Sequence, residues 1–308
     1  ISEKTLSEQL VTCIHQSKRA GYALEKWEFL KDYKYSVIFT CDDFSSTLKK
    51  AKEIIPLENT YENDYLYTSF VKPVAYSMDG YYFLKFNLAY AAIHPLTQEE
   101  FLTKYPFLVV FHEKGELIEF RFDVLKRVFL SDKKEPTIYS NLIAEMSDYF
   151  KEHFECDLIP LNLDFMVNVC KRDENVKLIA QSMKLPNGGN AQLDVGNNQE
   201  YILPFIGELR SLLNDNQAEL EKVPDFREAL EQFMFEMEEM SDYPWIELLW
   251  ENEIKTRSNR VKFVFNYMNK SYCLIQYYYS NVLIGMERMN YVIEYIVNHR
   301  NDDTTQNE

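Results

Sequence analysis

The amino-acid sequence predicts an α+β fold with largely antiparallel sheets, built from hairpins that are each followed by a covering helix, in two subdomains. Two observations carry this prediction. Short apolar runs lie on either side of turn residues, as in paired strands, and stretches with apolar residues every three or four positions follow them. This unit occurs at about 107–154, 176–213 and 262–299. A distant duplication is one explanation, but low residue identity favours independent use of a common unit.

The first half begins with a helix that places Leu6, Leu10 and Ile14 on one face. A strand at Tyr35–Thr40, a capped helix that ends at Pro56 and a long strand within residues 80–95 follow. The boundaries predicted for the subdomains are 1–155 and 156–300, with a loose tail at 301–308.

The clearest hairpin is "FLVVFHEKGELIEFRF", residues 107–122. Its second run alternates apolar and charged residues, and successive side chains of a strand point to opposite faces. We therefore expect Glu119, Arg121 and Asp123 to lie on a face that is open to water. The helix expected at about 139–154 has one apolar stripe, which consists of Leu142, Met146, Tyr149 and His153. Its position on the stripe makes His153 a hydrogen-bonded core histidine in this interpretation.

A glycine cluster, "LPNGGNAQLDVGNN", covers residues 185–198. It lacks the spacing of a phosphate-binding loop, and a strand rather than a helix is expected after it. Asn187-Gly188 is instead typical of a tight hairpin turn, because both central residues of such a turn need positive φ. The sequence predicts a hairpin here, followed by a helix from Pro204.

The strongest helical pattern in the chain is "VPDFREALEQFMFEMEEM", which starts at Pro224. Its apolar residues recur at spacings of four and three, at Phe226, Leu230, Phe233, Met237 and Met240. A strand at Trp245–Lys255, a hairpin and a final helix follow. The final helix has an apolar stripe of Val282, Met286, Met289, Ile293 and Ile296.

The charge of the chain is strongly negative, with 33 Lys and Arg against 49 Asp and Glu, a net −16. This disfavours a general binder of nucleic acid or anionic membranes, which must neutralise phosphate, although a local basic patch can override the total charge. The stretch 200–254 alone has 15 acids and 3 bases, a net −12. We expect a soluble cytoplasmic protein, because no apolar run is long enough to span a bilayer and the five cysteines form no CxxC pair.

The acidic residues of the predicted helix that starts at Pro224 form the first candidate binding site. They are either exposed to solvent or bind a basic partner. A solvated face is the simpler interpretation, and a partner-binding face is the functional one. The candidate partner-binding residues are Glu228, Glu231, Glu236, Glu238 and Glu239.

A basic stretch follows at once, with five bases and no acid between Lys255 and Lys270. The aromatic hairpin after it offers rings on which bases stack. Lys255, Arg257, Arg260 and Lys262 are therefore the nucleic-acid candidate, although alternate tyrosines more commonly build sheet faces.

The strand at Trp245–Lys255 places Glu247, Glu251, Glu253 and Lys255 on one face. The pattern is similar to the E-x-K strand of restriction-endonuclease-like nucleases, in which carboxylates hold Mg²⁺ and a lysine orients the attacking water. The same short template also fits residues 32–34 and 132–134. A solvated strand face is thus the preferred interpretation, and a nuclease the alternative.

Other metal or nucleophile sites have little support in the sequence. His153 and Cys156 have ligand-like spacing, and Cys170 follows, but no second close pair completes a tetrahedral zinc site. We expect no metal and no cofactor, with Mg²⁺ only under the nuclease alternative.

The sequence as a whole favours a non-catalytic protein that binds a macromolecule. It is expected to work as a subunit of a larger assembly or as an oligomer, with a protein partner at the acidic stretch. The composition is compatible with a bacterial or phage defence component. Whether it catalyses any reaction stays open at this point.

Overall fold

The computed structural model describes residues 9, 12, 18–54, 66–93, 98–125, 137–173, 175–184, 190–194, 209, 212–213, 215–239, 242–251, 258–278 and 285–300. The glycine turn and the tail lie outside these residues, as do most residues of the predicted N-terminal helix and of the predicted helix from Pro204. The chain forms two compact units. Unit 1 consists of Ile1–Leu161 and Tyr279–Asn298, and unit 2 of Asn162–Tyr278 and His299–Glu308.

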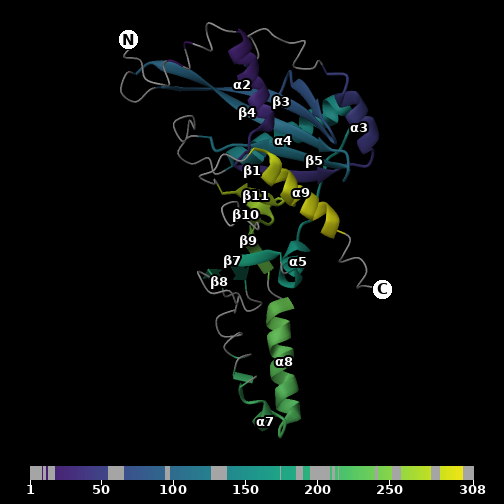
Figure 1. Cartoon of the computed structure of the whole chain (residues 1–308), viewed down its shortest axis with the longest axis vertical. Coiled ribbons are helices and arrows are strands. Elements are labelled where there is room, and N and C mark those ends of the chain that lie inside the picture. The colour runs from purple at the N-terminus through teal and green to yellow at the C-terminus, as the bar shows by residue number, and fades with distance from the viewer. Residues whose placement is uncertain are drawn as a thin grey trace. The chain divides into compact units, whose positions relative to one another are not determined.

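Unit 1 contains an antiparallel sheet in the order β2-β3-β4-β5-β1, with the short β6 paired to β1. Figure 1 labels β1, β3, β4 and β5 of this sheet. Its strands are β1 (Tyr35–Thr40), β2 (Val74–Met78), β3 (Tyr81–Ile93), β4 (Glu100–His112), β5 (Leu117–Phe122) and β6 (Ile159–Pro160). Its helices are α2 (Lys18–Leu30), α3 (Phe44–Ala51), α4 (Ile138–Phe154) and α9 (Glu287–His299). The last helix, expected in the second subdomain, is grouped with this unit up to Asn298.

Unit 2 contains a second set of antiparallel strands, in the order β11-β10-β9-β7-β8. These are β7 (Val176–Lys184), β8 (Asn190–Asp194), β9 (Asp242–Trp250), β10 (Asn259–Val264) and β11 (Leu274–Tyr277). Its helices are α5 (Met166–Arg172), α7 (Gln217–Leu220), α8 (Pro224–Glu239) and the 3-10 turn η3 (Tyr267–Asn269). The predicted α+β class with antiparallel hairpins is confirmed.

One face of the unit 1 sheet, which we call the aromatic face, carries Phe107, Phe111, Phe120 and Phe122. The Phe150 ring of α4 lies 6.0 Å from Phe111 and 5.8 Å from Phe120. Phe107 and Phe122 stack with their planes 5° apart. All four phenylalanines are fully buried. The aromatic face against α4 is therefore the main apolar core of the unit.

The opposite face, which we call the charged face, carries Lys85, Glu119 and Arg121, and all three side chains are fully buried. The prediction that Glu119 and Arg121 face water is wrong. Two helices distant in sequence cover them: α2 contacts Lys85 through Glu28, and α9 contacts Arg121 through Asn290. As predicted, Glu119 and Arg121 share one face of β5 and the phenylalanines share the other. However, α2 and α9 cover the face that was expected to be exposed to solvent.

Helix boundaries follow local signals. The Asp43 carboxylate accepts a hydrogen bond from the Ser46 amide at 2.9 Å and caps α3. Helix α4 ends at a left-handed Glu155, with φ 54° and ψ 39°. The interpretation of His153 as a core histidine is wrong, because its side chain is exposed and stacks on Tyr149 with ring centroids 3.9 Å apart.

The hairpin around the glycine cluster is confirmed, since β7 and β8 pair antiparallel with Lys184 opposite Asn190. The predicted strand at Trp245–Lys255 is β9, which begins earlier and ends at Trp250. Glu253, Lys255 and Arg257 lie outside the described residues. The final helix is confirmed as α9, in which Met289, Ile293 and Ile296 are buried. Met286, also buried, precedes the helix, and Val282 lies outside the described residues.

Candidate functional site

The predicted nuclease strand contributes one buried carboxylate, Glu247, to a cluster on β9 and β10. Glu247 pairs in register with Lys262, and Arg260 lies one pair further along the same face. The Glu247 carboxylate is ion-paired with Arg260 and accepts a hydrogen bond from the Tyr278 hydroxyl at 3.0 Å. Burial followed by this hydrogen bond raises the pKa of Tyr278 to about 12. The carboxylate is thus occupied by groups of its own unit.

The other described carboxylate of that strand pattern, Glu251, follows the end of β9. It pairs with Lys177 on β7, with 2.8 Å between the charged atoms. Among the described residues, no group of three histidine, cysteine or carboxylate side chains is placed to hold a metal ion. Glu247 and Glu251 therefore have separate basic partners, and the described part of the nuclease pattern does not converge on a metal.

Two members of the nucleic-acid candidate are described, Arg260 and Lys262. The Arg260 guanidinium lies 4.8 Å from the centre of the Tyr278 ring, and the Lys262 ammonium lies 3.5 Å from the Trp245 ring. Burial lowers the pKa of Lys262. Both cations are thus engaged within unit 2 by rings and by Glu247, which reduces what they can offer to phosphate.

The acidic helix α8 exposes aromatic side chains as well as carboxylates. Phe226 is 59% exposed and Phe233 is 46% exposed. With the exposed Ala229 they lie on one helical face, because residues three and four apart are neighbours on a helix. The exposed Asp225 and Glu228 border this strip. We call the five residues the α8 surface.

The remaining acidic candidates lie on the same helix, whose position beside α7 is visible in Figure 1. Glu231 is exposed and accepts a hydrogen bond from Arg227 at 2.7 Å, one turn away. Glu236, Glu238 and Glu239 belong to α8, but their side chains lie outside the described part of the chain. Of the predicted apolar stripe, Leu230 is half-buried, and Met234 beside the stripe is buried. The helix therefore buries one side and leaves a neighbouring aromatic strip open.

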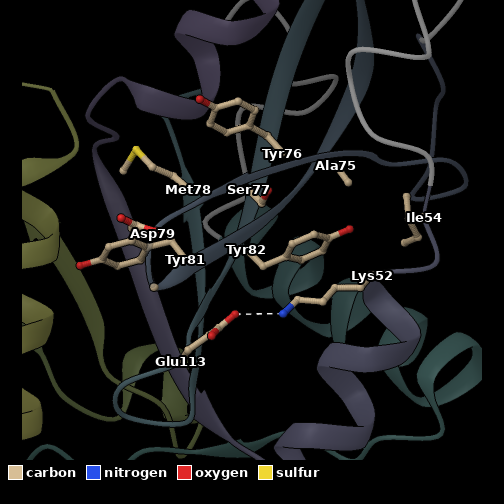
Figure 2. A pocket seen from close by; sticks show the side chains of 11 residues that line it. Lys52, Ile54, Ala75, Tyr76, Ser77, Met78, Asp79, Tyr81, Tyr82 and Glu113 are labelled. Atoms are coloured by element: carbon tan, nitrogen blue, oxygen red, sulfur yellow. Dashed lines mark hydrogen bonds and ion pairs between the residues drawn. The ribbon is translucent and has the colours of Figure 1, made fainter.

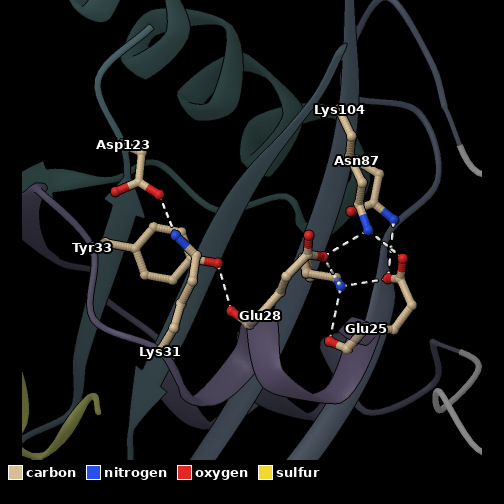
Figure 3. Close-up of polar contacts among 8 residues, drawn as sticks. Glu25, Glu28, Lys31, Tyr33, Asn87, Lys104 and Asp123 are labelled. Carbon is tan, nitrogen blue, oxygen red and sulfur yellow. Dashed lines mark hydrogen bonds and ion pairs between the residues drawn. The ribbon is translucent and has the colours of Figure 1, made fainter. Parts of the chain in front are cut away.

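Sequence reasoning missed the ionic cluster on the charged face of unit 1 (Figure 3). The ammonium of Lys85 on β3 contacts Glu28 of α2 at 2.6 Å and also Glu25, which is ion-paired with Lys104 of β4. Burial tends to raise the pKa of Glu25, but the two lysines outweigh it, so that its pKa is lowered. Burial lowers the pKa of Lys85. The one sequence signal was a lone lysine inside an apolar strand, "YYFLKFNLAY".

A second buried cluster on the charged face consists of His112, Glu119, Arg121 and Asn290. Glu119 contacts His112 Nε2 at 2.8 Å and Arg121 Nη2 at 2.6 Å, and Arg121 also donates to Asn290 Oδ1 at 2.7 Å. Burial lowers the pKa of His112. Burial opposes the charge of Glu119, but Arg121 and His112 outweigh it and lower its pKa. Three buried atoms, Ser36 Oγ, Glu119 Oε1 and Arg121 Nη1, have no hydrogen-bond partner in the described structure.

His112 lines a hollow of about 260 Å³ between the β2–β3 turn and α9. Tyr81 and Glu294 line it too, and the Tyr81 hydroxyl donates to Glu294 at 3.3 Å. A neutral imidazole held by a carboxylate is suited to act as a general base. However, the lining of this hollow contains no serine, threonine or cysteine for it to activate.

A larger hollow, of about 620 Å³, lies along β2 and the end of α3 (Figure 2). The ammonium of Lys52 contacts Glu113 at 3.0 Å there. The Tyr76, Tyr81 and Tyr82 rings point in different directions in Figure 2 and do not converge. The hollow therefore offers a surface for contact rather than an aromatic cage for a cation.

The residues with ligand-like spacing, His153, Cys156 and Cys170, do not form a metal-ligand set in the described part of the chain. His153 is exposed, and its Nδ1 lies 3.1 Å from the Tyr149 carbonyl oxygen. Cys170 is buried and its thiol contacts the Val167 carbonyl oxygen at 3.3 Å. Cys156 lies close to Cys41, whose side chain lowers its pKa.

No known protein family matches this chain, and no curated protein is detectably similar to it in sequence. No helix among the described residues is long and apolar enough to cross a membrane. Among the described residues, the α8 surface combines two exposed aromatic rings with exposed carboxylates, and we base the functional proposal on it.

Proposed function

We propose that this chain is a non-catalytic binding protein, a subunit of a larger assembly, and that the α8 surface docks a basic amphipathic segment of another protein. The observation that supports this most strongly is the exposure of Phe226 and Phe233 on a helix whose period is typical of a buried stripe. Aromatic side chains supply much of the energy of protein interfaces. An exposed aromatic strip bordered by carboxylates fits a partner with apolar and basic side chains.

Charge complementarity favours a different protein over a second copy of this chain. The stretch 200–254 has a net charge of −12, so two copies that met through α8 would bring like charges together. A basic segment instead gains electrostatic attraction, which also accelerates association. Reducing conditions of a cytoplasm suit this proposal, because the four cysteines in the described part of the chain are not joined by disulfides.

The test places a photo-crosslinking residue at Ala229 and, as a control, at the exposed Lys222 next to the helix. We expect one partner to be captured from Ala229 and not from Lys222. The purified partner is then measured against Phe226→Ser/Phe233→Ser, with Trp27→Ser, an exposed aromatic residue of unit 1, as the matched control. Loss of one aromatic anchor should weaken binding by about thirty-fold, and loss of both by about a thousand-fold if their effects add, because each anchor contributes about 2 kcal/mol.

Charge reversal separates the acidic contribution. Glu236→Lys/Glu238→Lys/Glu239→Lys and, separately, Asp225→Lys/Glu228→Lys should weaken the partner and reduce the salt dependence of its affinity. An affinity that is unchanged in both the serine and lysine variants contradicts the proposal and makes the acidic helix a solvated surface. Concentration-dependent dimerisation through α8, seen by ultracentrifugation, would replace the partner with a second copy.

A further inference from the structure

Two cysteines in unit 1, Cys41 and Cys156, lie just beyond the ends of elements that the sheet brings together. Cys41 follows β1, and Cys156 lies two residues after the end of α4. The pairing of β1 with β6 places Thr40 opposite Ile159. The two cysteines, 115 positions apart in sequence, therefore meet at one edge of the unit. Cys41 is half-buried and Cys156 is buried.

The two thiols lie close enough that each alters the pKa of the other. Thr47 of α3 lies beside both: its hydroxyl oxygen accepts a hydrogen bond from Cys41 Sγ at 3.9 Å, and its side chain also interacts with Cys156. The Thr47 hydroxyl is itself anchored, because it donates to the Asp43 carbonyl oxygen at 2.8 Å. The thiol pair thus sits against a fixed hydroxyl on a capped helix.

Contacts between α3 and the end of α4 hold the pair in place. The Lys50 ammonium donates to the Phe154 carbonyl oxygen at 2.9 Å and to the Glu155 carboxylate at 2.6 Å. Glu155 adopts the left-handed conformation, and the Cys156 amide donates back to the Phe150 carbonyl oxygen at 3.3 Å. The backbone on both sides of Cys156 is therefore fixed relative to the helix that contacts Cys41.

The hydrogen bonds make the two thiols chemically unequal. The bond from Cys41, followed by that from Thr47, lowers the pKa of Cys156 to about 7, although burial acts in the opposite direction. The pKa of Cys41 is raised by the same contact. A thiolate is the reactive form of cysteine, so Cys156 is the nucleophile of the pair and Cys41 its neighbouring thiol. By contrast, burial raises the pKa of Cys273 well above its usual value.

We propose that Cys41 and Cys156 form a peroxide-sensitive modification site that closes to an intramolecular disulfide. The Cys156 thiolate attacks one oxygen of hydrogen peroxide, the O–O bond breaks, and a sulfenic acid and hydroxide form. The Cys41 sulfur then attacks the sulfenic sulfur, an S–S bond forms, and the hydroxyl leaves as water with the Cys41 proton. In sum, two thiols are oxidised and one peroxide is reduced to two waters.

The test treats the full chain with one equivalent of hydrogen peroxide at neutral pH and maps thiols by mass spectrometry without reduction. We expect a crosslinked peptide pair with Cys41 and Cys156, while Cys170 and Cys273 stay reduced. In Cys41→Ser, Cys156 should be trapped by a sulfenic-acid reagent, and Cys156→Ser should form no crosslink. Thr47→Val removes one hydrogen bond to Cys156 and should shift the pH profile of its alkylation to higher pH.

Two results overturn the proposal. One is a wild-type chain in which Cys41 and Cys156 stay reduced, or are oxidised without a crosslink, under conditions that oxidise Cys170 or Cys273. The other is an alkylation profile of Cys156 that does not differ from that of Cys273. The wild-type map decides the matter even if a substituted chain does not fold.

Discussion

The charged face of unit 1 buries charged side chains, whereas the α8 surface of unit 2 exposes aromatic side chains. Each is the opposite of the usual location of such residues. In unit 1, Lys85, Glu119 and Arg121 are fully buried. In unit 2, Phe226 and Phe233 are about half exposed. The difference is that helices α2 and α9 supply partners for the buried charges, whereas the described structure leaves the aromatic strip of α8 open to solvent. The period of the sequence predicts which side chains share a face. Whether that face is buried depends on whether another helix or strand packs against it.

Paired phenylalanine substitutions should show the largest contrast between these regions. Phe120→Ala removes a fully buried ring on the aromatic face and should cost about 3–5 kcal/mol of unfolding free energy. Phe233→Ala removes a half-exposed ring and should cost less than about 1 kcal/mol. Urea unfolding, with hydrogen exchange of β5 amides to localise the effect, measures both. Similar costs would contradict the assignment of α8 as an open surface.

Arg121→Met tests how far the buried charges depend on each other. Without the guanidinium, Glu119 keeps His112 but loses its permanent positive partner, so we expect a loss of about 3 kcal/mol or more. Arg227→Met breaks the exposed pair with Glu231 on α8 and should leave the unfolding free energy almost unchanged, because solvent screens an exposed ion pair. A small effect of Arg121→Met would mean that this face is hydrated rather than sealed.

The pH dependence of stability isolates His112. Its pKa is lowered in the folded chain, so the unfolded chain binds the proton first as pH falls, and the stability contributed above pH 6.5 is lost below it. Glu119, whose pKa is also lowered, contributes above its ordinary value of 4.5 and loses this contribution only below that pH. Between pH 7 and 5.5, wild type should lose more unfolding free energy than His112→Gln. Equal slopes in urea titrations contradict a buried neutral imidazole.

The smallest expected effect is in a nuclease assay, in which we expect no cleavage. Glu247 is engaged by Arg260 and Tyr278, and Glu251 by Lys177, so neither carboxylate is open to Mg²⁺ in the described structure. We expect labelled DNA and RNA to stay intact with Mg²⁺ in a sensitive gel assay. Cleavage that requires Mg²⁺ and disappears in Glu253→Ala would instead establish the nuclease and remove the non-catalytic proposal.

Part of the candidate site was readable from sequence. The acidic content of α8, its start at Pro224 and the spacing of Phe226 and Phe233 were all predicted. Their exposure was not, because the same period is typical of buried and open stripes. The contact between Cys41 and Cys156 could not be predicted either, since 115 positions separate them and their spacing has no motif.

Local sequence patterns were enough to predict the α+β class, the long strand β3, the hairpin of β4 and β5, and helices α4, α8 and α9. These follow from local periods and turn residues, which act over a few positions of the chain. Three contacts depend on the tertiary structure: Lys85 with Glu28, Arg121 with Asn290, and Cys41 with Cys156. Each pair joins elements far apart in sequence, and burial depends on which element covers a face. Local sequence patterns do not show which element covers a given face, so they could not predict these contacts.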